Sequence, residues 1–516
     1  MASGSWALTG ALLALAVALY QRRSAARTRA GPLPPGPTPV PVLGNILDLT
    51  AKELWLAATQ WAKRFGDVVH VHVVGQGLVF LSSPEATMDL LEKKGSIYGD
   101  KPPLVMVGEL CGCENMVAFT RYGDVSRRQR RLLNQAFGTS SIPAYHPLIE
   151  TETHGFIRRL IADPKKYMQQ ARRYAGGLTL SVVYGYEPAL QNDKFLALGE
   201  ESVDLLANKI ASGGGIWPVD IFPALKNLPT WAPGSGFLLK AKVWKAKMTE
   251  FVDVPYNFVK ASMKTGNYVP SFCSMLLEDE KKCTPEFEFD LKWTANSMYG
   301  ASMDTTITVF SHFLIAMMQH PEVLVKAQQE IDSVVGKDRL PTFADRASLP
   351  YVDAILNEVY RWGVPVPLSL PHRLMEDDMY RGMLIPKGSL IFGNVWAIMR
   401  DETLFPNAAA FNPERYMEAV DPALARRRDP RSYVFGFGRR KCPGENLVEA
   451  SIWFLLANCI ATLDISKARD EFGNVVEPKI DFNNAVFRIP DQFDCDIRPR
   501  SQEALAALRL AEVMRA

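Results

Sequence analysis

The feature that most restricts how this chain can fold is a glycine-rich, cationic loop around one cysteine. Residues 435–444 read Phe-Gly-Phe-Gly-Arg-Arg-Lys-Cys-Pro-Gly, and the apolar run that follows over residues 447–460 predicts a helix. Neighbouring cations and a helix N-terminus lower the pKa of a cysteine, and the thiolate is the form that binds metal. Glycines let the backbone turn tightly and approach a bulky group. We therefore interpret Cys442 as the ligand of a large, planar group, rather than as a buried, inert cysteine.

The same loop resembles the haem-binding signature of the cytochrome P450 family. All five residue types that the signature fixes are present, at Phe435, Gly438, Arg440, Cys442 and Gly444. The resemblance implies that haem b (iron protoporphyrin IX) is the cofactor, that Cys442 is the axial ligand of its iron, and that Phe435 and Arg440 lie beside it. It also implies the cytochrome P450 fold, which is mainly α with small β-sheets.

The chain reads as one large domain behind a short amino-terminal segment. Its 516 residues are 47% hydrophobic, enough to bury a large core, and no linker, charge block or internal repeat divides them. We predict a transmembrane anchor over residues 1–21, a basic and proline-rich hinge over residues 22–44, and a haem domain over residues 45–516. The net charge of +2 indicates no nucleic-acid partner, since polyanion binders usually carry a concentrated basic face.

The amino-terminal segment predicts a membrane anchor. Residues 1–20 carry no charged side chain, and arginines at positions 22, 23, 27 and 29 follow. Such a segment can cross a bilayer, and positive charge on its C-terminal side keeps the following domain in the cytosol. We expect a single-pass protein of the endoplasmic reticulum membrane with a cytosolic catalytic domain. A cleaved signal peptide is the alternative, although its positive charge would precede the apolar run.

Local patterns predict a mostly helical protein with short strands. Alternating residues over 68–81 predict a β-hairpin with its turn at Gly75-Gln76-Gly77. Ser83 and Pro84 predict a helix start, and helical periodicity dominates from there to about residue 362. Strand-like pieces follow within residues 364–396 and 475–498.

The longest predicted helix, over about residues 291–319, has polar residues in its apolar middle. Such residues compete for backbone hydrogen bonds and cost stability in a buried helix, unless they form the solvated stripe of an amphipathic one. Residues 301–306 resemble the family's oxygen-activation motif, with Ser302 in place of the usual glycine. The resemblance implies a local opening of the helix beside the haem, with Asp304 and Thr305 supplying protons to dioxygen.

A second predicted helix carries Glu358 and Arg361, which share one face because they are three residues apart. An exposed pair of this kind needs no function. The match to the family's Glu-x-x-Arg helix implies instead a buried pair, joined by Arg415 from the downstream segment 411–416. We expect this trio to hold the core behind the cysteine loop.

The two haem propionates need cationic partners, and three candidates follow from the resemblance. Residues 122–131 resemble the family's Trp-x-x-x-Arg helix, which implies Arg130 as a ligand, with Ser126 in place of the tryptophan. The segment 371–373 resembles the strand that supplies a second ligand, His372, and Arg440 is the third. Other cations of these segments predict a basic proximal face that steers an acidic electron donor: Arg127, Arg128, Arg131, Arg439 and Lys441.

The activity that the resemblance implies is a monooxygenation that consumes O2. The sequence has no flavin or nicotinamide fingerprint, so the electrons are expected from a separate NADPH–cytochrome P450 reductase. A P450-fold isomerase or dehydratase, which needs no external electrons, is the first alternative, and Asp304 and Thr305 argue against it. A non-catalytic haem-binding or lipid-binding protein is the second, and the intact Cys442 argues against that.

The substrate is expected to be a hydrophobic, mostly neutral small molecule. The pocket walls that family topology implies are apolar with few charges: residues 100–115, 210–222, 299, 364–370 and 484–487. The chain is similar to fungal microsomal cytochromes P450 of secondary metabolism, around the O-methylsterigmatocystin oxidoreductase group. Among the substrates of that group we favour a terpenoid, and a polyketide or an indole stays open.

Overall fold

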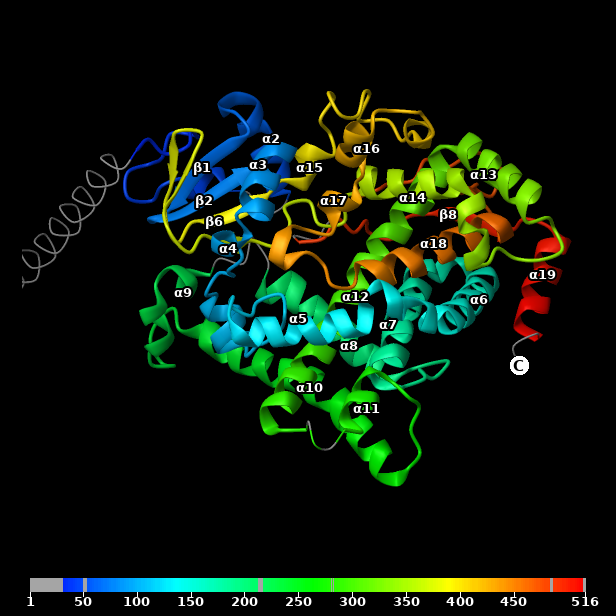
Figure 1. Ribbon diagram of the computed structural model, residues 1–516, viewed down its shortest axis with the longest axis horizontal. Coiled ribbons are helices and arrows are strands. Elements are labelled where there is room, and N and C mark those ends of the chain that lie inside the picture. Colours follow the sequence, from blue (N-terminus) through cyan, green and yellow to red (C-terminus); the bar gives the residue numbers. More distant parts are fainter. Residues whose placement is uncertain are drawn as a thin grey trace, which may run out of the picture.

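The computed structural model describes residues 31–49, 53–211, 217–279, 281, 283–482 and 486–513. The predicted anchor over residues 1–21 and residues 22–30 of the predicted hinge lie outside this part. Among the described residues, no helix is both long enough and apolar enough to span a bilayer. Figure 1 shows a small β-rich region at one end of the molecule and a larger helical body that fills the rest.

Helices make up most of the described chain, which confirms the predicted mainly α architecture with small β-sheets. The longer helices are α2 (Leu54–Phe65), α5 (Asp124–Phe137), α6 (His146–Ala162), α7 (Tyr167–Tyr184), α8 (Lys194–Asp204), α10 (Gly236–Thr265), α12 (Pro285–Gln319), α13 (Pro321–Val334), α14 (Pro350–Gly363), α18 (Glu445–Thr462) and α19 (Gln502–Val513). The shorter ones are α3 (Pro84–Thr87), α4 (Gly95–Tyr98), α9 (Pro218–Ile221), α11 (Phe272–Leu277), α15 (Val395–Ile398), α16 (Pro422–Arg428) and α17 (Arg431–Val434). Helical turns of other types used below are η3 (Val105–Leu110), η6 (Leu205–Ile210), η8 (Pro223–Asn227), η10 (Pro413–Tyr416) and η11 (Gly438–Arg440).

The main sheet has four strands in the order β1-β2-β6-β3. Strands β1 (Val68–Val73) and β2 (Gln76–Leu81) form the predicted hairpin, but its turn is Val74-Gly75, where both residues have positive φ, as a two-residue turn of type I′ requires. Strand β2 pairs in parallel with β6 (Leu390–Gly393), and β6 pairs antiparallel with β3 (His372–Arg373). Two smaller antiparallel sheets pair β4 (Asp378–Tyr380) with β5 (Met383–Ile385), and β7 (Leu463–Lys467) with β8 (Cys495–Pro499).

Helix α12 is the central element of the helical body. It begins at Pro285, earlier than predicted, because Thr284 caps it by accepting a hydrogen bond from the Phe287 amide at 3.2 Å. Every residue from Thr306 to Met318 is buried, and α5, α7, α8, α10 and α14 all pack against this helix (Figure 1). The helix runs without interruption through residues 301–306, so the local opening expected there is not present as a break.

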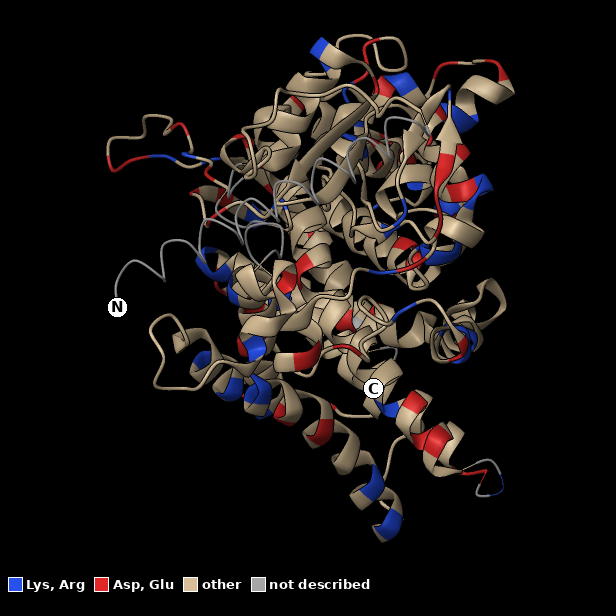
Figure 2. Cartoon of the chain, turned by 90° about the vertical axis from the view of Figure 1, so that its left-hand side faces the viewer, with Lys and Arg blue, Asp and Glu red and all other residues tan. Residues whose placement is uncertain are grey.

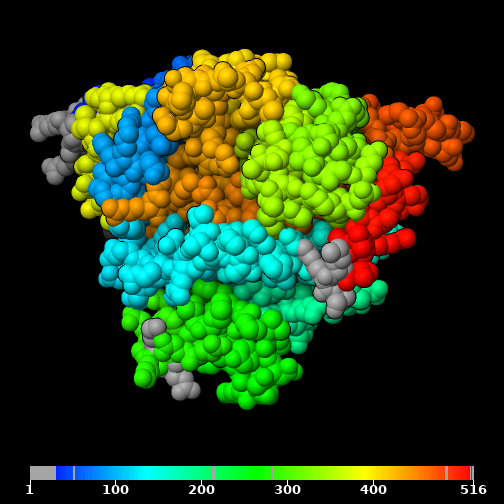
Figure 3. Space-filling model, turned by 45° about the vertical axis from the view of Figure 1, so that its right-hand side comes forward, coloured from blue at the N-terminus to red at the C-terminus, as the bar shows by residue number. Residues whose placement is uncertain are grey.

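Helix α18 is the second buried helix, and it follows the cysteine loop directly. Every residue from Ala450 to Thr462 is buried, as the apolar run in the sequence predicts. In Figure 3, α5 and α6 form a cyan band between the green region of α9 to α11 and the yellow-green and orange region of α13, α14 and the cysteine loop. Figure 2 shows cationic and anionic residues intermixed along the exposed helices. The cysteine loop precedes α18, which packs against both α5 and α14, so the loop lies where these three helices come together.

Candidate functional site

The loop that carries Cys442 is held in a tight conformation by its glycines. Gly436 and Gly438 have φ values of 77° and 52°, which favour glycine. A Cβ atom at Gly438 would lie 2.3 Å from the Leu91 carbonyl oxygen, so that position accepts no side chain. The Cys442 amide donates a 2.7 Å hydrogen bond to the Phe435 carbonyl and closes the loop. These contacts fix Cys442 just before the first residue of α18.

Burial governs the protonation of the Cys442 thiol. Although the residue is half-buried by its surface exposure, the enclosure of its thiol by other atoms raises the pKa. A hydrogen bond from the Gly444 amide, Arg130 and Lys441 act in the opposite direction, and Glu445 adds to the rise. The cations and the Gly444 amide lower this pKa as expected, but in the polypeptide by itself burial outweighs them, so the expectation of a net lowered pKa is wrong. Coordination to a metal ion deprotonates a thiol outright, so the geometry still suits a thiolate ligand.

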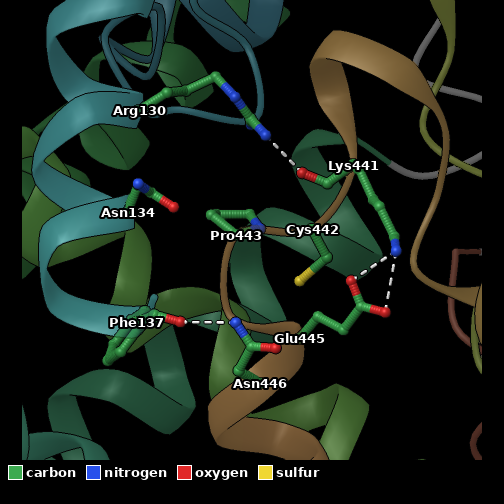
Figure 4. A pocket seen from close by; sticks show the side chains of 8 residues that line it. All are labelled: Arg130, Asn134, Phe137, Lys441, Cys442, Pro443, Glu445 and Asn446. Carbon is green, nitrogen blue, oxygen red and sulfur yellow. Dashed lines mark hydrogen bonds and ion pairs between the residues drawn. The ribbon is translucent and has the colours of Figure 1, made fainter. Parts of the chain in front are cut away.

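A pocket of about 330 Å³ lies beside Cys442, between α5 and the start of α18 (Figure 4). Arg130 donates to the Lys441 carbonyl at 2.5 Å, and Asn446 donates to the Phe137 carbonyl at 2.9 Å. Both bonds join α5 to the cysteine segment. The lining residues are Arg130, Asn134, Phe137, Lys441, Cys442, Pro443, Glu445 and Asn446. Arg130 and Cys442, two predicted site residues, thus lie in one pocket.

Arg440 points away from that pocket, towards the start of α5. It donates to the carbonyl oxygens of Gly99 at 2.7 Å and Thr120 at 2.8 Å, and to the Ser126 hydroxyl at 3.1 Å. Ser126 is buried and stands where the family pattern has a tryptophan. The Ser126 hydroxyl therefore accepts a hydrogen bond from the Arg440 guanidinium at this position.

Two further nitrogen-bearing side chains complete a cluster around Arg440. Lys101 is only 5% exposed, and its ammonium donates to the carbonyl oxygens of Leu370 at 3.2 Å and Pro371 at 3.0 Å. His372 is buried, and its Nδ1 lies 2.8 Å from the Tyr98 carbonyl oxygen, which can only accept, so Nδ1 carries a proton. No partner of His372 Nε2 is found among the described residues.

Arg130 also belongs to this cluster. Within the cluster of Lys101, Arg130, His372 and Arg440, positive charge on one side chain disfavours positive charge on the others. Burial lowers the pKa of Lys101, and Arg440 and Arg130 lower it further. Burial also lowers the pKa of His372, with Lys101 and Arg440 adding to the effect, and lowers that of Arg440 to about 10, with Arg130 adding. His372 is therefore neutral, and the positive charges of Lys101, Arg130 and Arg440 are not compensated by one another.

The nearby Asp100 carboxylate raises the pKa values of Lys101 and Arg440, but its side-chain hydrogen bonds are made with other partners. Asp100 accepts hydrogen bonds from Arg121 Nε at 2.8 Å and from the Tyr122 amide at 2.9 Å. The cluster donates to carbonyl and hydroxyl oxygens only, and charges buried in this way are normally paired. Two carboxylates are what it lacks, and haem b has two propionates, so the residues present fit the cofactor that the sequence implies.

Phe435 covers the inner side of the cysteine loop. Its ring packs edge-on against that of Tyr360 in α14, with 5.6 Å between the ring centres. Its carbonyl oxygen is the acceptor of the Cys442 amide. The residue thus links the cysteine to α14.

Asp304 and Thr305 lie on α12, on a stretch that is less buried than residues 306–318, which follow it. Ala301 is exposed, and the Thr305 hydroxyl donates to the Ala301 carbonyl at 2.9 Å. The Ser302 hydroxyl donates to the Tyr299 carbonyl at 3.0 Å. No hydrogen bond among the described residues joins this stretch to the Cys442 loop. The open face at Ala301 and Thr305 leaves their atoms accessible to a small molecule.

The pKa of the Asp304 carboxyl group lies well above the ordinary value for an aspartate. Burial raises its pKa to about 6, Arg172 acts in the opposite direction, and Asp204 and Glu200 add to the rise. A carboxyl group with this pKa can take up and release a proton near neutral pH.

Glu358, Arg361 and Arg415 come together in one buried network. Glu358 and Arg361 are fully buried and form two hydrogen bonds of 2.7 Å, and Arg415 adds one to Glu358 at 3.2 Å. The Asn412 amide donates to Glu358 at 2.8 Å. Arg361 also donates to the carbonyl oxygens of Met399 and Ala408 at 2.9 and 2.8 Å. The trio fastens α14 to the segment that precedes the cysteine loop.

The predicted basic face is weaker than the sequence indicates. Arg127 is paired with Asp124, Arg128 with Asp290 and Glu286, and Lys441 with Glu445. Arg439 contacts the Tyr122 hydroxyl, and Arg131 is exposed. Most of these cations are therefore neutralised locally. The partners of Arg127 and Lys441 lie three and four residues away, and the fold brings the distant partners of Arg128.

Sequence reasoning missed Lys101. The residue lies in an Asp-Lys-Pro-Pro segment that reads as an ordinary loop. Its burial depends on residues 370–371, which lie far along the chain. No local signal distinguishes it from a surface lysine.

The chain is similar to known proteins over most of its length. The family model "Cytochrome P450" matches residues 34–482. The chain is 38% identical to cytochrome P450 monooxygenase claT of Ampulloclitocybe clavipes, over 92% of this chain and 93% of that protein. It is 40% identical to cytochrome P450 monooxygenase 208 of Postia placenta, over 96% and 94% of the two chains, and 38% identical to cytochrome P450 monooxygenase ple1 of Rhodocybe pseudopiperita, over 92% and 91%. These names state an activity and no substrate.

Proposed function

The chain belongs to the cytochrome P450 family, and we propose that it is a membrane-anchored monooxygenase of secondary metabolism that hydroxylates a hydrophobic, uncharged small molecule. The family binds haem b through a cysteine thiolate and requires a reductase and O2. The observation that carries the assignment of the site is the closed glycine loop that places Cys442 at the start of α18, beside a cluster of cations that lacks carboxylate partners.

In this proposal each site residue has one task. Cys442 Sγ binds the iron of haem b, which supplies the activation of dioxygen. Lys101, Arg130, His372 and Arg440 bind the propionates and so orient the cofactor. Phe435 shields the thiolate from water.

Asp304 and Thr305 deliver the protons that the reaction consumes. Thr305 Oγ1 faces the open side of α12, and the Asp304 carboxyl group one residue away has a pKa of about 6. A proton can therefore pass from Asp304 to the Thr305 hydroxyl and on to the reacting oxygen, near neutral pH.

We favour a terpenoid as the substrate, with a polyketide or an indole as the competing classes. The apolar pocket walls in the sequence support a neutral, hydrophobic molecule, and they do not separate these classes.

The partner and the location complete the proposal. We expect NADPH–cytochrome P450 reductase as the electron donor, docking on the side where Arg131 and Arg439 are exposed. We expect the endoplasmic reticulum membrane as the location, with residues 1–21 as the anchor. Support comes from exposed apolar side chains in the segments 42–47 and 222–231, among them Val42, Leu47, Phe222 and Trp231.

The test uses purified full-length protein with reductase. The reduced carbon-monoxide complex should have the absorption band of thiolate-bound haem, and Cys442→Ala should abolish it; an unchanged band would refute the ligand assignment. Binding spectra with terpene, polyketide and indole panels should identify the substrate class, because a ligand that enters the site shifts the iron from low to high spin. Product should form only when NADPH and reductase are both present.

The proton role has its own test. Thr305→Ala and Asp304→Asn should each release more hydrogen peroxide per NADPH consumed than the unchanged enzyme. Tight coupling of NADPH consumption to product formation in both variants would remove this role.

A further inference from the structure

The open face of α12 ends about two helical turns after Thr305. Thr308 and His312 follow Thr305 by three and seven residues, so the three side chains lie on one side of the helix. Ala301 is exposed and Thr305 is half-buried, whereas Thr308 and His312 are fully buried. A Cβ atom at Gly363 of α14 would lie 2.9 Å from His312 Cγ, so α12 and the end of α14 are in close contact here. The surface that is accessible at Ala301 therefore closes at His312.

His312 accepts a buried hydrogen bond from an arginine. Its Nδ1 lies 2.8 Å from the Thr308 carbonyl oxygen, which can only accept, so Nδ1 carries a proton. Its Nε2 lies 2.6 Å from Nη1 of Arg488, and a guanidinium can only donate, so Nε2 is the acceptor. Burial and the charge of Arg488 hold the pKa of His312 well below its ordinary value. His312 is therefore neutral, and this form fits both partners.

Arg488 is held on several sides. Its guanidinium carbon lies 3.9 Å from the ring centre of Phe482 and 4.8 Å from that of Trp396. Its Nη1 also donates to the carbonyl of Gly363, the last residue of α14, at 3.3 Å, and its amide donates to the Pro365 carbonyl at 3.1 Å. A planar guanidinium stacks on aromatic rings and donates in its own plane, and cations are favoured at helix C-termini. Both the side chain and the main chain of Arg488 are thus fixed.

A second arginine shares part of these surroundings and provides a matched comparison. The guanidinium carbon of Arg400 lies 3.5 Å from the ring centre of the same Trp396. The hydrogen bonds that this guanidinium forms among the described residues go to the carbonyls of Arg361 at 3.4 Å and Trp362 at 2.8 Å, both in α14. Both arginines therefore bind the end of α14, and Arg488 is the one that also binds α12.

Two half-buried apolar residues, Val486 and Phe487, immediately precede Arg488. Phe487 packs against the main hydrophobic core of the helical body. Consecutive Cα atoms are only about 3.8 Å apart, so the place of these residues depends on that of Arg488. A displacement of Arg488 from His312 would therefore move apolar side chains close to the end of the open face.

We propose that Arg488 is a positioning residue that determines substrate length: its contact with His312 fixes Val486 and Phe487 where the open face of α12 ends. The inference rests on the proposed function, in which the substrate lies beside the haem along this face. Arg488 acts through its two neighbours and takes no part in the chemistry. The length of molecule that the site accepts then depends on the contact between Arg488 and His312.

The probe is a series of 1-alkylimidazoles, from 1-ethylimidazole to 1-dodecylimidazole, added to the full-length haem protein. The imidazole nitrogen binds haem iron whatever the natural substrate is, and the shift of the absorption spectrum gives a Kd for each chain length. Each methylene that becomes buried should tighten binding about fourfold. In the unchanged protein this gain should stop at the chain length that reaches the end of the open face.

The variants remove the contact in two ways. Arg488→Gln deletes the donor, and His312→Phe keeps a ring but loses both hydrogen bonds. In both, the gain should continue over at least two more methylenes, so the longest imidazoles should bind about tenfold more tightly or better, while the shortest bind as before. His312→Gln keeps one donor and one acceptor and should keep the original length. Arg400→Gln makes the same change beside the same tryptophan and should also keep it.

A second measurement does not need bound haem. Hydrogen exchange of the full-length protein, with and without haem, should become faster over residues 486–489 in Arg488→Gln, because the segment loses its attachment to α12. Arg400→Gln should leave exchange over these residues as it is. This measurement applies even to a variant that retains little haem.

The outcomes separate the inference from the proposed function. If no 1-alkylimidazole shifts the spectrum of the unchanged protein, the haem assignment is wrong. If the imidazoles bind but the gain stops at the same length in Arg488→Gln and His312→Phe, Arg488 does not set the length and the inference is wrong. A uniform loss of affinity at every chain length, an equal change in Arg400→Gln, or unchanged exchange over residues 486–489 would also overturn it.

Discussion

At the scale of single residues, the site is built from side chains that the polypeptide stabilises poorly by itself. Lys101 is buried and its ammonium has two carbonyl partners, while the charges of Arg440 and Arg130 lower its pKa and only Asp100 opposes them. For Asp304, burial disfavours the charged form of the carboxyl group and so raises its pKa. Perturbed groups of this kind cluster at functional sites because catalysis and cofactor binding need them.

Lys101→Met should weaken haem retention without destabilising the apoprotein. A hydrogen bond to a charged group contributes about 1.5–3 kcal/mol, so haem transfer to an acceptor protein should be about tenfold faster or more. The apoprotein should unfold at the same denaturant concentration as before, or at a higher one, because a buried charge is removed. Lys93→Met, at a side chain that is 72% exposed, is the control. Equal rates of haem loss in the two variants would exclude Lys101 as a propionate ligand.

Asp304→Asn should stabilise the fold more at high pH than at low pH. The folded protein keeps this carboxyl protonated up to about pH 6, whereas the unfolded chain releases the proton near pH 4. The folded state therefore binds more protons between these values, and the free energy of unfolding falls as the pH rises through them. The gain from the substitution should grow by about 1–2 kcal/mol between about pH 5 and pH 8. Thermal unfolding at both pH values measures it, with the exposed Asp124→Asn as control; a gain independent of pH would contradict the assigned pKa.

At the scale of elements, α14 is the support of the cysteine loop. Its Glu358 and Arg361 are fully buried, and together they bind η10 and the segment around Ala408. Tyr360, from the same helix, packs on Phe435. A displacement of α14 would therefore reach the cysteine loop directly.

Glu358→Gln should destabilise the protein strongly. It leaves Arg361 and Arg415 buried without a negative partner, and breaking a buried pair costs about 3–5 kcal/mol. Denaturant unfolding of the purified protein measures this cost, and the haem content should fall with it. Glu414→Gln makes the same chemical change in an exposed pair with Lys326, where the expected cost is about 0–1 kcal/mol. Similar costs for the two variants would show that the buried network is not needed.

At the scale of the whole molecule, two segments that are far apart in the chain, residues 105–110 and residues 217–227, are joined by a few contacts. Asp220 of α9 accepts hydrogen bonds from the Met106 amide of η3 at 2.9 Å and from the Trp217 amide at 2.8 Å. Lys226 of η8 and Glu109 of η3 add an ion pair of 2.6 Å. These contacts hold together two stretches that family topology places at the substrate pocket.

Asp220→Ala should loosen that connection. The Met106 amide loses its acceptor, and an unsatisfied buried donor costs about 1–3 kcal/mol. Hydrogen exchange should become faster over residues 105–110 and 217–222, and hydrophobic ligands should bind and leave faster in stopped-flow experiments. Lys226→Met removes only the exposed pair and should change exchange little. Unchanged protection at Met106 would show that Asp220 does not hold η3.

Local patterns in the sequence predict the helices, the hairpin and the cysteine loop, because periodicity, caps and glycines act over a few residues. The residues of the Glu358 trio and of the cation cluster could be proposed through family motifs. The parallel pairing of β2 with β6, the burial of Lys101 and the acidic partners of Arg128 could not be predicted, because each joins segments that are far apart in the chain. The pKa of Cys442 differs from the expectation for the same reason, since burial is a property of the fold.

In the proposed site, the cations around Arg440 would make iron porphyrin a counter-ion as well as a catalyst. A newly synthesised chain that meets no porphyrin keeps like charges pressed together beside α5, so cellular haem supply should govern how much of this protein escapes proteolysis.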